Sequence, residues 1–171
     1  MKELFVIDLQ DYDKSWNVYK RPSARGIIIV DEKIALVYSE KEKYYKFPGG
    51  GIRENEDIKT ALIREVLEEV GLVVIPDSIR EFGSVMRRQK STFSGNTIFE
   101  QENFYFFCNA KNQLLGQHLD DYEKEAKFVL RLVDIDDAMR VNSEYHSDDF
   151  FDEIMIKREM KVLELIKAHI R

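Results

Sequence analysis

The stretch Gly50–Leu72 reads GGIRENEDIKTALIREVLEEVGL and is the most informative part of the 171-residue chain. Asp57 is a favourable N-cap residue, and Gly71 is of a type that commonly follows the last turn of a helix. We therefore expect a helix of about 13 residues that starts after Asp57 and ends at Val70.

Three glutamates occupy one side of this expected helix. At about 100° per residue, Glu65, Glu68 and Glu69 fall within an arc of about 100°. Like charges at this spacing oppose helix formation, and Arg64 can directly offset only its i,i+4 partner Glu68. A hard divalent cation such as Mg²⁺, which binds carboxylate oxygens, would relieve the repulsion. The alternative for such a face alone is an acidic surface that faces solvent.

A run of three glycines precedes the helix, in the segment Phe47-Pro48-Gly49-Gly50-Gly51. Residues without a Cβ let the backbone approach a ligand or a metal ion closely. Glycine clusters also form ordinary turns, so this run is a weak indication of function when taken alone.

The rest of the chain mixes strands and helices. Two apolar, β-branched runs, Arg25–Val30 and Ile34–Ser39, predict a hairpin. A short helix capped by Asp134 or Asp136 is expected to run through Met139. Further strands are expected at Ile79–Arg87, Ile98–Asn109 and Lys127–Val133.

The chain has no internal repeat, low-complexity tract or flexible linker. We therefore expect a single domain over residues 1–171, with an N-terminal extension of about residues 1–22 to which we assign no role. Apolar residues at helical spacing predict a closing C-terminal helix over about residues 148–170.

Composition restricts the class of protein and of partner. The chain is 44% hydrophobic and 34% charged, which is typical of a soluble globular protein. Lysine and arginine number 26 against 32 acidic residues, so the net charge of -6 would repel a nucleic-acid backbone. A small phosphorylated ligand remains compatible, because a bound divalent cation reverses the sign of the local field.

The single cysteine, Cys108, cannot form an internal disulfide, and residues 1–10 lack the pattern of a secretion signal. These features predict a cytoplasmic location. No apolar run approaches the roughly 20 residues that a spanning helix needs, so we expect no membrane partner.

The segment Gly50–Leu72 resembles the Nudix box, G-x5-E-x7-R-E-U-x-E-E-x-G-U with U apolar, and matches it at every defined position. A looser resemblance covers the hairpin at residues 25–39, residues 45–50 and the later strands, and it fades after about Asp136. The resemblance implies an α+β fold, an α/β/α sandwich with a mixed central β-sheet, as in MutT-like proteins.

The same resemblance implies roles for the residues of the box. Glu65 and Glu69 would be the principal ligands of Mg²⁺, with Mn²⁺ as the alternative ion. Glu68 would be a further ligand or would contact a metal-bound water, and the Gly50 carbonyl would be a backbone ligand. Arg64 would take part in catalysis by orienting the glutamates through ion pairs.

Two further carboxylates gain expected roles from the resemblance. Glu56 would brace the loop before the helix. Members of the family often recruit another glutamate, as a base or a metal ligand, from the loop before a late strand. Glu123 and Glu125 are the candidates here, and we favour Glu123, although a surface charge run is an equal alternative.

Three residues outside the box are candidates for binding substrate. Tyr45 and Phe47 could stack on a base, because aromatic faces accept purines readily, although packing is the alternative for both. Arg87 belongs with Arg88 and Lys90 to a short basic stretch at the end of an expected strand. This stretch could contact phosphate, or it could be an ordinary solvated edge.

The sequence thus predicts a metal-dependent hydrolase that cleaves a diphosphate linkage in a nucleoside diphosphate linked to another group, or in a nucleoside triphosphate. Carboxylate-held ions would neutralise the diphosphate and activate a water molecule. The small-molecule nucleotide that it binds is not specified by the box, and a homodimer is expected only by analogy with the family.

Three alternatives remain at this stage. A nucleotide-binding sensor would keep the fold without the chemistry, but every glutamate of the box is present. An isoprenoid diphosphate isomerase would need a catalytic cysteine, for which Cys108 is the only candidate. Removal of pyrophosphate from RNA 5′ ends is disfavoured by the acidic charge balance.

Overall fold

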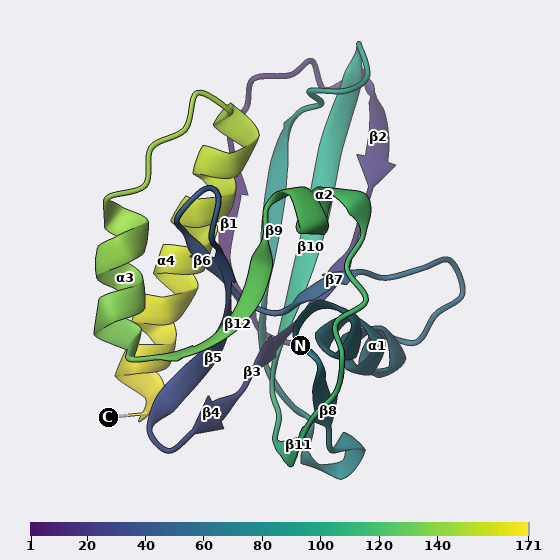
Figure 1. The fold of residues 1–171 in the computed structure, drawn as a ribbon. Helices are drawn as coiled ribbons and strands as arrows, with labels where there is room; N and C mark the ends of the chain where they lie inside the picture. Colours follow the sequence, from purple (N-terminus) through teal and green to yellow (C-terminus); the bar gives the residue numbers. More distant parts are fainter. Residues whose placement is uncertain (171) are drawn as a thin grey trace.

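The computed structural model describes residues 1–170, which form three layers. One helix, α1, covers one side of the strands, and two helices, α3 and α4, cover the other (Figure 1). The strands are β1 (Glu3–Asp8), β2 (Asn17–Lys20), β3 (Ser23–Ile27), β4 (Ile29–Val30), β5 (Lys33–Ser39), β6 (Tyr45–Lys46), β7 (Gly49–Gly51), β8 (Leu72–Val74), β9 (Arg80–Lys90), β10 (Thr97–Phe107), β11 (Ala110–Leu114) and β12 (Phe128–Val133). The α-helices are α1 (Ile58–Val70), α2 (Asp121–Glu125), α3 (Ile135–Ser143) and α4 (Phe150–Ile170), and a 3-10 helix spans Pro76–Ser78.

The largest sheet is mixed, with the order β1-β9-β10-β3-β7 and with β2 also beside β10. Strands β9 and β10 pair antiparallel, whereas β3 and β10 pair parallel. The expectation of an α/β/α arrangement around a mixed sheet is therefore confirmed. A second sheet has the order β12-β5-β4 with β6 beside β5, and β8 pairs with β11.

The N-terminal residues, to which we assigned no role, extend the central sheet. Strand β1 pairs parallel with β9, and β2 pairs parallel with the first part of β10. Strand β3 continues along β10 after Pro22, where the backbone has no N–H to contribute to the ladder. Residues 1–22 thus form part of the same sheet that carries the glycine loop in β7.

The helix expected after Asp57 is confirmed at both ends. The Asp57 side chain accepts hydrogen bonds from the backbone N–H groups of Lys59 and Thr60. Gly71 ends the helix in the left-handed conformation, with a φ of 71°. The buried face of α1 packs against β3 and β7, so the helix lies directly beside the glycine run.

The hairpin of residues 25–39 is present as β4 and β5, while β3 leaves it to join the central sheet. The short helix α3 starts after Asp134, as expected, but runs on to Ser143. Helix α4 covers Phe150–Ile170 and closes the fold, whereas α2 was not anticipated. No helix among residues 1–170 has both the length and the apolar character needed to cross a membrane.

Candidate active site

Arg64 holds three carboxylates of the box in a fixed arrangement. Its Nε and Nη2 donate to the two carboxylate oxygens of Glu56, at 2.7 and 2.8 Å. Its Nη1 donates to Glu65 and, at 3.0 Å, to Glu68. Nη2 also donates to the Gly51 carbonyl at 3.1 Å, which ties the helix to the glycine loop. A planar guanidinium with two-pronged contacts fixes its partners well, so Arg64 is placed to orient these glutamates.

Glu69 is buried and contacts the glycine loop at Gly49. Its Oε2 accepts a hydrogen bond of 2.9 Å from the Gly49 N–H. Its Oε1 forms an ion pair with the Lys46 ammonium, which also lies 4.4 Å from the centre of the Phe128 ring. The buried charge of Glu69 is therefore balanced within the protein by Lys46.

The carboxylate of Glu65 lies against the backbone of Gly50. A Cβ added to Gly50 would come within 2.1 Å of Glu65 Oε2, so no side chain fits between the loop and the helix. Burial raises the pKa of Glu65, and the neighbouring Arg64 partly opposes this rise. The backbone of Gly50 thus lies close to a carboxylate, and backbone carbonyls and carboxylates are the oxygen donors that Mg²⁺ and Mn²⁺ accept.

The donor set fits a hard divalent cation in its chemistry, although the carboxylates in this structure are paired with cations of the protein. Within residues 1–170, no three acidic, histidine or cysteine side chains converge on one point. Glu65 and Glu68 face Arg64, and Glu69 faces Lys46. Mg²⁺ usually keeps several waters and takes only one or two protein carboxylates, so a three-carboxylate cage is not required.

A cleft of about 480 Å³ opens beside the box. One wall carries the glycine run and Glu65, a second comes from α2, and a third from the start of α4. In the view of Figure 1, helix α2 is drawn in front of strands β9 and β10. Arg158 of α4 also lines the cleft, and further lining residues come from the strands and from the segments next to them: Arg21, Ser23, Arg25, Lys46, Arg87, Phe99 and Gln101.

Glu123 lines the cleft, on the unanticipated helix α2. Its side chain accepts a hydrogen bond of 2.9 Å from the Asp120 N–H, which closes a capping box at the start of the helix. Burial, together with the charge of Glu69, raises the pKa of Glu123. Glu125 instead forms an exposed ion pair with Lys41. Of the two candidates, only Glu123 is placed near the box.

The two aromatic candidates lie outside the cleft. Phe47 is fully buried and packs edge-to-face on Tyr105, so its expected contact with a base is corrected to a role in the core. Tyr45 stacks on Tyr38, with 4.7 Å between the ring centres, and its backbone pairs with the Asn142 side chain. The structure does not bring Tyr45 to the lining of the cleft.

Arg87 does line the cleft, but the basic stretch expected around it does not form. Successive side chains of a strand point to opposite faces, so Arg87 and Arg88 separate. Arg87 is fully buried, whereas Arg88 pairs with Glu100 at 2.6 Å near the surface. Residues 87–90 therefore do not act as one basic patch. Arg87 belongs to the buried lining of the cleft and not to a solvated edge.

Sequence reasoning missed several residues of the cleft: Arg158, Gln101, Tyr122, Asp149, Phe151 and Asp152. Two signals were available. Gln101 and Asn103 are polar residues at alternate, inward positions of an apolar strand. Arg158 and Glu159 form a buried ion pair between apolar positions of α4. Buried polar residues need partners, so both signals point to an organised polar region beneath the cleft.

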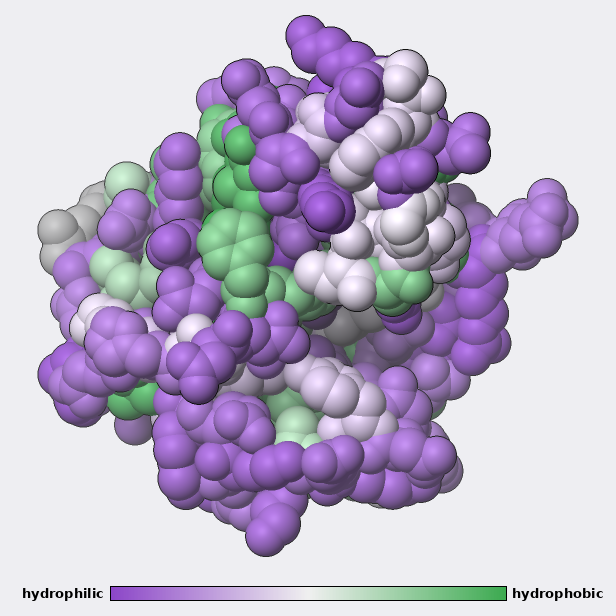
Figure 2. Space-filling model, turned by 90° about the horizontal axis from the view of Figure 1, so that it is seen from above, coloured by the Kyte–Doolittle hydropathy of each residue, from purple (hydrophilic) through white to green (hydrophobic). Residues whose placement is uncertain are grey.

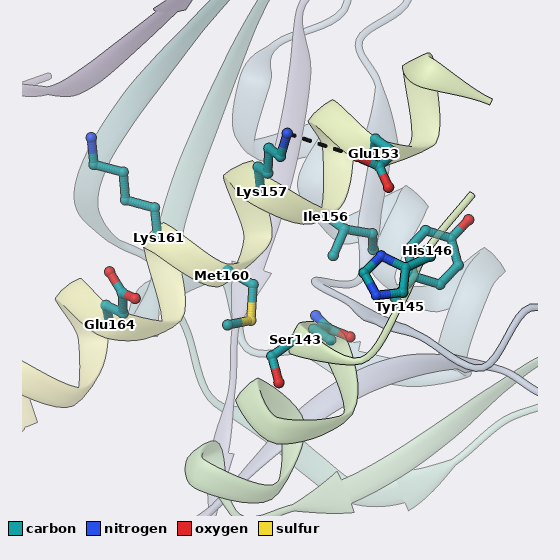
Figure 3. Close-up of a pocket in the computed structure, with 10 residues that line it drawn as sticks. Ser143, Tyr145, His146, Glu153, Ile156, Lys157, Met160, Lys161 and Glu164 are labelled. Carbon is teal, nitrogen blue, oxygen red and sulfur yellow. Dashed lines mark ion pairs between the residues drawn. The ribbon is translucent and has the colours of Figure 1, made fainter. Parts of the chain in front are cut away.

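A second hollow, of about 410 Å³, lies between α3 and α4 and shares no lining residue with the cleft. Its floor includes Ile156 and Met160, and Glu153 and Lys157 form an ion pair above them (Figure 3). His146 lies at its edge, beside Tyr145 (Figure 3). No residue of the box reaches this hollow, so the chemistry that the sequence predicts belongs to the cleft.

Cys108 is buried in the core and does not line the cleft. Burial raises the pKa of its thiol to about 12, which keeps the thiol protonated at neutral pH. The cleft therefore has no cysteine of the kind that an isomerase on this fold would need.

The fold and the carboxylate-bearing helix beside a glycine loop define a Nudix-type protein. Residues 20–154 match the model of the NUDIX domain family, and the chain belongs to this family. The described elements that carry the match run from β2 to the first turns of α4.

Among curated proteins, a segment of the chain is 44% identical over 54 residues to an "8-oxo-dGTP diphosphatase" of Buchnera aphidicola. Another is 42% identical over 65 residues to an "RNA pyrophosphohydrolase" of Hydrogenovibrio crunogenus. These segments cover 29% and 37% of this chain, and 42% and 38% of the relatives. The chain therefore aligns with less than half the length of either relative.

A NUDIX hydrolase of Nitrosomonas europaea has a similar solved structure, with a TM-score of 0.54. The two sequences are 19% identical, and the match covers 82% of this chain and 89% of the other. This similarity supports the shared fold.

Proposed function

We propose that this chain is a metal-dependent hydrolase that cleaves a diphosphate linkage in a nucleoside diphosphate linked to another group, or in a nucleoside triphosphate. The observation that carries the proposal is the contact between Glu65 and the Gly50 backbone at the wall of the cleft. Enzymes of the family generally use divalent metals, and we propose Mg²⁺, with Mn²⁺ as a substitute, held by the Gly50 carbonyl, Glu65, Glu68 and Glu69.

When bound, such an ion neutralises the diphosphate and lowers the pKa of a water molecule that attacks phosphorus. The protein contributes the geometry of the site. Arg64 holds Glu65 and Glu68 in place, and Gly49 holds Glu69 through its backbone N–H. Glu123, whose pKa is raised by burial, is placed to accept a proton within the cleft.

The relatives named RNA pyrophosphohydrolases support a second candidate, the removal of pyrophosphate from RNA 5′ ends. The net charge of -6 does not favour a polynucleotide. The sensor alternative lacks a specific observation in its favour, because the residues of the box are present and ordered around Arg64. A homodimer and a cytoplasmic location remain predictions.

The test measures phosphate from a panel of nucleoside triphosphates, nucleoside diphosphate sugars, dinucleotides and 5′-triphosphorylated RNA, with Mg²⁺ or Mn²⁺. A coupling enzyme converts the products to inorganic phosphate: a pyrophosphatase for the triphosphates and the RNA, and a phosphatase for the other substrates. We expect metal-dependent turnover that falls by at least about 100-fold in Glu69→Gln. Glu54→Gln, a change at an exposed position that the box leaves undefined, should retain wild-type activity. Turnover of RNA in preference to free nucleotides would select the second candidate, and ligand binding without any turnover would support a sensor.

A further inference from the structure

One nitrogen of the buried Arg87 has no partner in the protein. Arg87 is fully buried and lines the cleft. Its Nε donates to Gln89 Oε1 at 2.7 Å, and its Nη2 donates to the Phe151 carbonyl at 2.9 Å. Within residues 1–170, Nη1 makes no hydrogen bond. A buried donor without a partner is costly, so this position is suited to a ligand that supplies an acceptor.

Aromatic rings fix the plane of the Arg87 guanidinium. Its central carbon lies 3.9 Å from the centre of the Phe151 ring and 5.8 Å from that of Phe99. The two rings meet at 5.4 Å between centres. These contacts and the two hydrogen bonds hold the arginine in one geometry, so little side-chain entropy remains to be lost when a ligand binds.

The next residue along α4, Asp152, also lines the cleft. In the part of the chain that the structure describes, its carboxylate forms no hydrogen bond and no ion pair, and it does not pair directly with Arg87. Both carboxylate oxygens are free to accept hydrogen bonds. The cleft therefore offers one unpartnered nitrogen of a fixed guanidinium and a carboxylate whose two oxygens accept no hydrogen bond from the described residues.

Arg87 and Asp152 together restrict the chemical class of ligand that the cleft can bind. A second phosphate group would suit Arg87, but Asp149 and Asp152 line the same part of the cleft and would repel it. A neutral ring that presents acceptors on one side and donors on the other would satisfy both residues. Seen from above, the molecule shows a largely hydrophilic surface with some hydrophobic residues near the centre of the view (Figure 2).

Guanine matches this arrangement more fully than the other bases. Its O6 is an acceptor for the one free nitrogen of Arg87, Nη1. Its N1–H and 2-amino group are two parallel donors, which match both oxygens of a carboxylate. Adenine has only its 6-amino group as a donor, and uracil has only N3–H. We propose that Arg87 and Asp152 form a guanine-binding subsite, in which Asp152 determines the specificity for the base.

This inference rests on the proposed function, because it names the base of the nucleotide that the enzyme hydrolyses. Gly50 and Glu65 lie in the same cleft as Arg87 and Asp152, so one nucleotide can present its diphosphate to the box and its base to the subsite. The substrate class is then a guanine nucleotide.

The test compares GTP, XTP and ATP as substrates of the wild type and of Asp152→Asn. Xanthine carries a 2-oxo group where guanine has its 2-amino group. A carboxylate repels this oxygen, whereas an asparagine amide can donate to it. We expect the wild type to prefer GTP over both others by at least about tenfold in kcat/KM. The variant should lose about tenfold on GTP and gain about tenfold on XTP. A gain cannot arise from misfolding.

The matched control is Asp148→Asn, a change at an exposed aspartate outside the cleft, which should keep the wild-type preference. Binding of GMP, XMP and AMP, measured by calorimetry in EDTA, gives a second readout that needs no turnover. GMP binding that weakens in Asp152→Asn, while XMP binding strengthens, would support the subsite even if no nucleotide were hydrolysed. In that case only the proposed hydrolysis would be wrong. Equal use of all three bases by an active wild type would overturn the subsite and leave the hydrolase standing.

Discussion

The carboxylate of Glu159 on α4 accepts a hydrogen bond of 2.6 Å from the backbone N–H of Phe47. Phe47 directly precedes the Pro48–Gly51 loop, so a residue about 110 positions away in the sequence positions the approach to the box. The other oxygen of Glu159 accepts hydrogen bonds from Tyr105 at 3.1 Å and from Arg158 at 2.9 Å. The glycine loop is thus supported by a buried polar network on the opposite side from α1.

We expect Glu159→Gln to lower the free energy of unfolding by about 3 kcal/mol, because it leaves the charge of Arg158 buried without its counter-ion. Urea denaturation followed by circular dichroism would measure the change. Glu164→Gln, on the exposed side of the same helix, should stay within about 0.5 kcal/mol of the wild type. Similar stabilities for the two variants would contradict the role given to Glu159.

Gly50→Ala should lower kcat/KM by about 100-fold with the fold retained, because the new methyl group would displace Glu65 from the loop. Gly116→Ala is the matched control, since an added Cβ there meets nothing within 4 Å. Steady-state kinetics and circular dichroism of both variants would check this. An active Gly50→Ala enzyme would show that the contact of the loop with Glu65 is dispensable.

The ion pair of Glu56 with Arg64 should make stability depend on pH. Hydrogen bonds from Arg64 lower the pKa of Glu56 from 4.5 to about 2. A carboxyl whose pKa is lowered by folding contributes stability above pH 4.5, and this stability is lost as the pH falls toward 2. Glu56→Gln should therefore be less stable than the wild type at pH 6, and the difference should shrink across this window. Chemical denaturation at several pH values measures it, with Glu54→Gln as the control. If the difference in stability between Glu56→Gln and the wild type did not change with pH, the ion pair of Glu56 with Arg64 would not be its cause.

Lys46 should compete with a metal ion for Glu69. In Lys46→Met, the buried Glu69 carboxylate loses its ammonium partner. We expect a lower melting temperature in EDTA and an apparent Kd for Mn²⁺ that is smaller by about tenfold, because the ion no longer has to displace a cation. Calorimetry and thermal melts measure both quantities. Lys59→Met, an exposed change on α1, should alter neither quantity. Weaker Mn²⁺ binding in Lys46→Met would contradict the competition and would show that Lys46 helps to form the metal site.

The parts of the fold that the sequence predicted depend on local chemistry. The caps at Asp57 and Gly71 fix α1 within a few residues, and the spacing of Glu65, Glu68 and Glu69 follows from the helical period alone. The turn of the β4–β5 hairpin is also local, because the chain reverses over Asp31 and Glu32, which both have positive φ.

The parts that were missed depend on contacts between distant segments. The parallel pairing of β1 with β9 leaves no mark in residues 1–22 themselves. Arg87 appeared to belong to a surface stretch because the face of the strand on which it lies is decided by the packing of α4. Phe47 gave no local sign that its ring is enclosed by Tyr105 and the core.

Helix α4 supplies both Asp152 to the cleft and Glu159 beneath the loop, although it follows the box by some 80 residues in the chain. During synthesis on the ribosome, a chain that has just completed the box already has the glutamates of the box. It still lacks Glu123 and the walls of the cleft that α2 and α4 provide. Both the third wall of the cleft and the support of Phe47 therefore depend on residues that are synthesised long after the box.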